Sequence, residues 1–117
     1  THPSAPFMVT AFSVALAENK RVFVDVTADW CVTCKANKYN VLLRDDVQVA
    51  LSAPDVVALR GDWSRPSDTI SQFLTTRGSA AVPFNQIYGP GLPQGHVLPA
   101  LLSREAVLST LSDAKGK

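Results

Sequence analysis

The sequence predicts an α/β domain in which a mixed β-sheet is flanked by helices. Short runs rich in β-branched residues alternate with segments whose apolar residues recur at helical spacing, and this alternation is typical of α/β sandwiches. A length of 117 residues suits one domain with one core of modest size. The hydrophobic content of 46% and the charged content of 18% are those of a globular protein.

The first half of the chain is expected to run helix, strand, helix, short helix and strand. The strand at 22–27 is apolar on both faces except for Asp25, as in a strand that is covered on both sides. The pair Asp45-Asp46 should end the long helix and cap the short one. In order, the expected elements are a helix from Phe12 to about Lys20 with Ala15 and Leu16 on its apolar face, the strand at 22–27, a helix reaching about Arg44, a short helix with Val47, Ala50 and Leu51, and a strand at 56–59.

The second half is expected to run helix, strand, strand and helix. Glycine at position 78 is the residue expected just after a helix, and Ser103 precedes the last helical pattern. A further strand at 7–10 is an additional expectation for the start of the chain. The expected elements are a loop at 61–66, a helix with Ile70, Phe73 and Leu74, a strand at 84–88, a turn at 89–91, a strand at 96–102, and a helix with Val107, Leu108 and Leu111.

Composition excludes several classes of protein. The net charge is near +1 with acids and bases mixed, so there is no basic block of the kind that binds nucleic acid. The longest stretch without Asp, Glu, Lys or Arg, residues 78–103, contains four prolines and four glycines and is therefore not a membrane helix. His2 and His96 are isolated, and two cysteines are too few for a disulfide scaffold or a self-contained zinc site.

The expected organisation is a single domain. We expect residues 1–6 to be a linker or tail, residues 7–114 to form the domain, and residues 115–117 to be a short C-terminal tail. The chain begins without Met and without a signal-peptide pattern, as an excised fragment would. We therefore expect one domain of a longer protein, monomeric when isolated.

The two cysteines, Cys31 and Cys34, form a Cys-x-x-Cys motif where the predicted strand passes into a helix. This spacing and context indicate a redox-active dithiol. Cys31 is the expected nucleophile, because backbone N–H groups and the dipole at a helix start favour its thiolate. Cys34, one turn further and more buried, is expected to resolve the mixed disulfide. The alternatives are a static structural disulfide or two inert thiols.

The segment around the cysteines resembles the active site of the thioredoxin superfamily. The resemblance lies in residues 24–35, VDVTADWCVTCK, and in Val82-Pro83, which falls where the superfamily carries a cis-proline. Within the superfamily the chain is most similar to the C-terminal periplasmic (gamma) domain of the DsbD and ScsB transmembrane thiol–disulfide reductases. Val32 after the first cysteine favours this branch over thioredoxin itself, and we favour ScsB. The resemblance implies a thioredoxin-like fold.

The sequence departs from that pattern in four places, which bear on how the reactivity of the dithiol is tuned and on which partner is bound. Lys38 replaces a Glu that many relatives carry, and Phe84 follows the proline where Thr is usual. No clear counterpart of a usual Gly is present around Pro99-Ala100. The loop at 89–95 is expected to be longer and richer in proline than in relatives.

The resemblance also implies roles for the neighbours of the dithiol. Asp25, six residues before Cys31, matches the superfamily's buried acid, which accepts the proton of Cys34; the alternative is a solvated Asp at an edge. Trp30, Val82 and Pro83 are expected to contact partners, with Val82 offering its backbone to an extended segment. Lys35 is expected to support the thiolate electrostatically.

Three further residues have both a functional and a structural interpretation. Arg60 is expected either to pair with Asp25 from the neighbouring strand or to lie at the surface. Lys38 is expected either to be a solvated surface residue or to attract an acidic partner. Trp63 is expected to pack the loop rather than to bind a cofactor.

The resemblance implies a protein-disulfide reductase, periplasmic, as a soluble domain of an inner-membrane protein. It would take electrons from the transmembrane domain of its parent and pass them to the parent's N-terminal domain or to a soluble thioredoxin-like protein. No cofactor or metal is expected beyond the Cys31–Cys34 dithiol. The ScsB branch adds an association with copper tolerance.

Three alternatives to this function stay open. One is a free-standing thioredoxin-like reductase with an external electron donor. Another is a Cu(I)-binding module that uses Cys31 and Cys34, since soft thiolates suit Cu(I). The third is a redox-inactive interaction domain.

Overall fold

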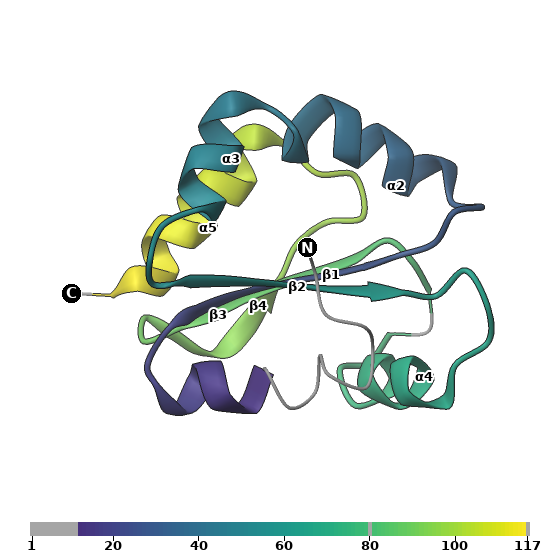
Figure 1. The fold of residues 1–117 in the computed structure, drawn as a ribbon, viewed down its shortest axis with the longest axis horizontal. Coiled ribbons are helices and arrows are strands. Elements are labelled where there is room, and N and C mark those ends of the chain that lie inside the picture. The colour runs from purple at the N-terminus through teal and green to yellow at the C-terminus, as the bar shows by residue number, and fades with distance from the viewer. Residues whose placement is uncertain (1–11, 80, 117) are drawn as a thin grey trace.

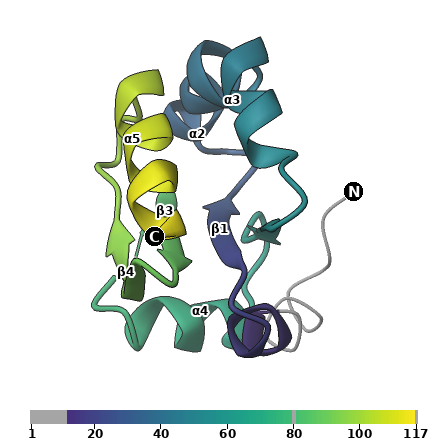
Figure 2. The same ribbon diagram turned by 90° about the vertical axis from the view of Figure 1, so that its left-hand side faces the viewer.

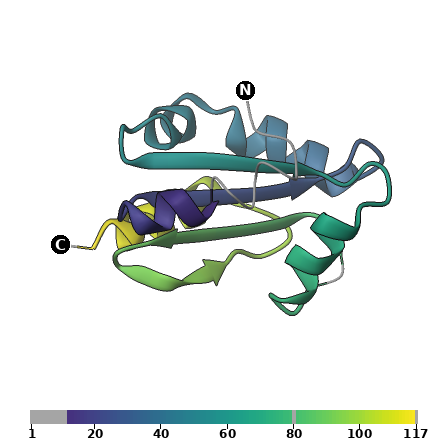
Figure 3. The same ribbon diagram turned by 60° about the horizontal axis from the view of Figure 1, so that its bottom comes forward.

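The computed structural model describes residues 12–79 and 81–116, which fold around a four-stranded mixed sheet (Figure 1). The strand order is β2-β1-β3-β4, and this order can be followed from top to bottom in Figure 3. β1 is parallel to β2 and antiparallel to β3, and β4 is antiparallel to β3. The prediction of a mixed sheet flanked by helices is confirmed.

Most of the predicted elements are present at or near their expected bounds. The elements are helical residues 12–17, followed by β1 (Arg21–Thr27), α2 (Val32–Asn37), the π-helix η1 (Lys38–Leu42), α3 (Asp45–Leu51), β2 (Val56–Asp62), α4 (Asp68–Thr75), β3 (Phe84–Gly89), β4 (Leu92–Val97) and α5 (Arg104–Lys115). The strand expected at 7–10 and the tail at 1–6 lie outside the described residues, and the domain limits stay predictions.

Alternate residues of β1 face opposite sides of the sheet and belong to two separate cores. α2, α3 and α5 cover one face, and α4 and the helical residues 12–17 cover the other (Figure 2). The first core contains Phe23, Val41, Val47, Ile87, Leu98, Leu102, Val107, Leu111 and Ala114. The second contains Ala15, Val22, Val24, Val26, Leu59, Ile70, Phe73, Leu74, Phe84 and Tyr88. The central strand is therefore covered on both faces, as its sequence predicts.

The two edge strands differ from the prediction. β2 continues to Asp62, three residues beyond its expected end, so Gly61 and Asp62 are strand residues and not loop. The final strand is Leu92–Val97, whereas residues 98–103 are irregular and the strand predicted at 96–102 is wrong in most of its length. The segment 89–95, expected to be a long loop, consists of the last residue of β3, a turn at 90–91 and the first part of β4. Edge strands tolerate proline and glycine, so Pro93 and Gly95 did not mark a loop.

The helical layer above the dithiol also departs from the prediction. The single long helix is an α-helix that widens into a π-helix at Lys38. Asp45 and Asp46 do not cap the next helix, because the N-cap is Arg44 without a side-chain hydrogen bond. They occupy the first turn instead, where carboxylates interact favourably with the helix dipole.

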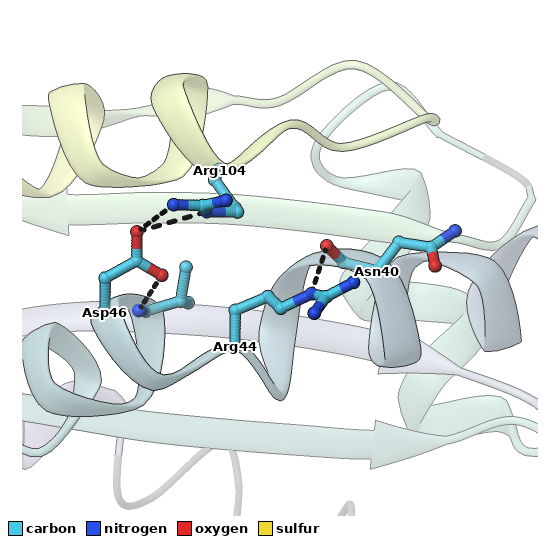
Figure 4. A network of polar contacts seen from close by, with 5 residues as sticks. Asn40, Arg44, Asp46 and Arg104 are labelled. Atoms are coloured by element: carbon cyan, nitrogen blue, oxygen red, sulfur yellow. Dashed lines mark hydrogen bonds and ion pairs between the residues drawn. The ribbon is translucent and has the colours of Figure 1, made fainter.

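A surface ion pair joins α3 to α5 (Figure 4). Arg104 donates from Nε and Nη2 to Oδ2 of Asp46 at 3.1 and 2.8 Å, and Oδ1 of Asp46 accepts the N–H of Val47 at 2.9 Å. The hydrogen bond from Arg104 lowers the pKa of Asp46. The pair is exposed, so it contributes little to stability.

The caps predicted for the last helix and for the end of α4 are present. Ser103 Oγ accepts the N–H of Ala106 at 3.1 Å, and Gly78 adopts a positive φ of 73° just after α4, where a side chain would be strained. Within residues 12–79 and 81–116, no helix has both the length and the apolar character that crossing a bilayer requires.

Candidate active site

The disulfide lies where β1 passes into α2, at the right-hand end of the molecule in Figure 1. Cys31 is the N-cap of α2, and its Sγ accepts the backbone N–H of Cys34 at 3.1 Å. Cys31 and Cys34 form a disulfide with their Cα atoms 5.2 Å apart. The N–H that faces Sγ would stabilise a Cys31 thiolate once the disulfide is reduced.

The two cysteines are about equally buried, with exposed fractions of 6% for Cys31 and 7% for Cys34. The prediction that Cys34 is the more buried of the two is therefore wrong. Their surroundings distinguish them instead. Cys34 lines a cavity that opens to solvent, whereas Cys31 is not part of its lining.

The opposite wall of the dithiol comes from the segment before β3. Val82 packs against Ala28, Cys31 and Cys34, and the peptide bond from Val82 to Pro83 is cis. The expected cis-proline is thus present, and Val82 stands beside the disulfide, where a partner segment is expected to bind. That binding role stays a prediction.

Asp25 and Cys34 line the same cavity, which has a volume of about 480 Å³ and lies between the sheet and the helices α2, η1 and α3. Asp25 is partly buried, and its Oδ1 accepts the side-chain N–H of Asn85 at 2.9 Å. A carboxylate that shares a cavity with Cys34 is in a position to exchange a proton with that cysteine through water. The geometry agrees with the predicted role of Asp25, which remains to be tested.

Arg60 faces the same cavity from the neighbouring strand. It is the register partner of Asp25 in the parallel β1–β2 pair, so the structure places the two residues side by side. Arg60 is partly buried, and within the described chain its Nε has no hydrogen-bond partner. Of the two interpretations of Arg60, the neighbour of Asp25 fits better than the surface residue.

Trp30 and Lys35 border the dithiol from the solvent side. The indole of Trp30 is 59% exposed, so it is available to a partner. Lys35 is exposed and, with Lys38, lines the mouth of the cavity beside Cys34. Trp63, which was expected to pack the loop, packs against the second core.

The loop after β2 holds the segment that leads to the cysteines. Ser64 Oγ accepts the backbone N–H of Asp29 at 2.8 Å and donates to Oδ1 of Asp62. Hydrogen bonds from Ser64 are the main cause that lowers the pKa of Asp62, and the charge of Arg60 adds to them. This connection fixes Asp29, two residues before Cys31, and nothing in the sequence indicated it.

Asn37 is a second residue that sequence reasoning missed. It is 2% exposed, donates from Nδ2 to the carbonyl of Ala100 at 2.8 Å, and accepts at Oδ1 the N–H of Leu102 at 2.9 Å. It thereby ties the loop before α5 to the redox helix. The available signal was its place in phase with buried Cys34 and Val41, at i, i+3 and i+7, where a polar residue needs a buried partner.

Fold and site together define a thiol–disulfide oxidoreductase domain with a Cys-x-x-Cys disulfide at a helix start and a cis-proline opposite. A family model described as thioredoxin-like matches residues 7–90. The chain belongs to this thioredoxin-like family. A search of curated protein sequences found no match.

Solved structures of the same fold support this assignment. The C-terminal domain of DsbD from Neisseria meningitidis matches with a TM-score of 0.78 in its oxidised form, at 18% identity over 98% of this chain and 99% of that one. The reduced form of the same domain matches with a TM-score of 0.77, at 19% identity over 97% of this chain and 100% of that one. A thioredoxin from Thermus thermophilus matches with a TM-score of 0.65, at 20% identity over 89% of this chain and 80% of that one. At these identities the likeness establishes the fold, and the preference for ScsB stays a prediction.

Proposed function

We propose that this domain is a protein-disulfide reductase that relays electrons from a membrane-embedded donor to thiol partners in the periplasm. The observation that carries the proposal is that the Cys31–Cys34 disulfide has Val82 packed against it and that Cys34 shares a cavity with Asp25. The likeness to the DsbD C-terminal domain, which covers nearly all of both chains, supports the membrane relay and the periplasmic location.

The reaction has two halves. A donor thiolate attacks Cys31 Sγ, Cys34 leaves as a thiolate and takes up a proton, and a second donor thiol releases the reduced domain. The Cys31 thiolate then attacks a partner disulfide and displaces one partner sulfur. Cys34 then gives its proton to Asp25 and attacks Cys31 Sγ. This attack restores the Cys31–Cys34 disulfide and frees the partner as a dithiol. Electrons pass through the two sulfur atoms, so the proposal includes no further cofactor.

The reduction potential tests the direction of electron flow. Equilibration of the chain with dithiothreitol or glutathione buffers should give roughly −270 mV or somewhat above it, in the thioredoxin range. A value near about −120 mV, typical of a disulfide oxidant, would contradict the reductase assignment.

The roles of the two cysteines can be tested by trapping. A Cys34→Ala variant should accumulate a mixed disulfide through Cys31, because nothing resolves it. Accumulation through Cys34 in the matched Cys31→Ala variant would reverse the assignment. A free-standing reductase stays the principal alternative, and transmembrane helices encoded upstream of Thr1 would argue against it.

A further inference from the structure

The outer face of α2 and η1 has a charge of one sign. Residues 30–44 contain three of the eleven basic residues of the chain and none of its ten acidic residues. The three cations, Lys35, Lys38 and Arg44, are all exposed. The rest of the chain carries eight basic and ten acidic residues, so the segment that bears the dithiol is positive on a molecule that is otherwise slightly negative.

The same face exposes large apolar side chains. The exposed fractions are 79% for Val32, 62% for Tyr39, 59% for Trp30 and 48% for Leu43. The described structure has eight such exposed side chains, and half of them belong to this segment of fifteen residues. A concentration of exposed apolar groups of this kind marks an interaction site more often than a solvated surface. The Lys38 ammonium lies 5.7 Å from the Tyr39 ring centroid, so charge and aromatic surface adjoin.

This face continues into the cavity that reaches Cys34. Lys35, Lys38, Tyr39 and Leu43 line both the face and the cavity. The other charged side chains in the lining are Asp25, Asp29 and Arg60, so cations outnumber carboxylates there. Positive groups therefore predominate along the cavity that reaches Cys34.

We propose that this surface, named the basic redox face and made of Trp30, Val32, Lys35, Lys38, Tyr39 and Leu43, binds partner proteins whose reactive disulfide lies in an acidic surface with apolar residues. The inference rests on the proposed function and adds the chemistry of the partner. Complementary charge accelerates association and depends on ionic strength, whereas the apolar side chains provide the contact area. An interface of this composition selects acidic disulfides from others of equal reduction potential.

The test compares three synthetic peptides with the same intramolecular disulfide and the same apolar flanks, surrounded by glutamates, lysines or glutamines. The reduced chain is mixed with each peptide at pH 7, and second-order rate constants are measured at about 20 mM and about 0.5 M salt, where screening is weak and strong. We expect the acidic peptide to react about 10-fold faster than the glutamine peptide at low salt, and the ratio to approach one at high salt. The basic peptide should react more slowly than both.

Variants locate the effect. The double variant Lys35→Glu/Lys38→Glu should reverse the preference between acidic and basic peptides, and the single variants Lys35→Gln and Lys38→Gln should each reduce it. Lys115→Gln is the matched control for the two single variants, because it makes the same charge change at the end of α5, at the far end of the molecule from the dithiol (Figure 1). Ratios to the glutamine peptide remove any change in the nucleophilicity of Cys31.

The outcomes separate the two proposals. Equal rates with the acidic and basic peptides at low salt would overturn the basic redox face and leave the reductase function standing. A loss of preference in Lys115→Gln equal to that in Lys35→Gln and Lys38→Gln would also overturn it, because the effect would then come from net charge. Failure to reduce any of the peptides would overturn the reductase function, and the inference with it.

Discussion

The two charged residues of β1, Arg21 and Asp25, lie near opposite ends of one buried strand and are used differently. Three hydrogen bonds hold Arg21: Nε and Nη2 donate to Asp55 at 2.7 and 2.8 Å, and Nη1 donates to the carbonyl of Leu111 at 3.0 Å. Asp25 accepts a hydrogen bond from Asn85 and borders the cavity that contains Cys34. A buried charge fixed by an ion pair serves structure, whereas one beside a cavity and a disulfide is in a position to take part in proton transfer.

The largest expected effect is on the chemistry at the Asp25 end. Replacing Asp25 with Asn should slow the attack of Cys34 on the mixed disulfide about 10²-fold at pH 7, because a positioned base contributes on this order. Reaction of the reduced chain with Ellman's reagent measures this step, since Cys31 releases the first thionitrobenzoate and Cys34 the second. The second release should slow and the first should change little.

The stability of the Asp25→Asn variant provides the contrast. Its free energy of unfolding should change by less than about 1 kcal/mol, because Asn keeps a polar group beside Asn85. If the second release proceeds at the wild-type rate, Asp25 is not the proton acceptor and the contrast with Arg21 fails.

The opposite result is expected at the Arg21 end. Arg21→Met keeps the aliphatic part of the side chain but removes three hydrogen bonds, two to Asp55 and one to the carbonyl of Leu111. The free energy of unfolding in urea should fall by about 2 kcal/mol, while both releases of thionitrobenzoate keep their wild-type rates. A stable Arg21→Met variant with altered thiol kinetics would show that the two ends are coupled.

Local signals predicted most of the fold. The β-branched run of β1, the serine before α5 and the glycine after α4 each depend on residues close in sequence, and each was predicted correctly. The strand errors fell on the edge strands β2 and β4, which are covered less completely. There a polar end such as Arg60–Asp62, or a proline such as Pro93, is compatible with a strand, so sequence pattern does not distinguish strand from loop.

The residues of the candidate site also divide into those that local sequence predicted and those that it did not. The dithiol and Asp25 lie at fixed spacings within one short segment that resembles the superfamily's active site. The cis-proline was predicted from the single Val82-Pro83 pair. Asn37 meets its partners 63 and 65 residues away, and Ser64 meets Asp29 35 residues away. Such pairs form only once the chain has folded, so composition and periodicity contain little information about them.

The smallest expected effect is the pH dependence of stability that arises from Asp55. The hydrogen bonds from Arg21 are the main cause that holds the pKa of Asp55 below its usual value. A carboxyl whose pKa is depressed in the folded state stabilises the fold above its unfolded pKa, near 3.9, and this stabilisation is lost as the pH falls through the folded pKa. Asp55→Asn should therefore lower the free energy of unfolding above about pH 5 by roughly 1 kcal/mol, since the Asp55 side chain is 46% exposed. The difference from the wild type should shrink steadily below about pH 4. Urea unfolding at a series of pH values measures it, and a difference that stays constant down to about pH 2 would mean that the ion pair with Arg21 does not set the pKa of Asp55.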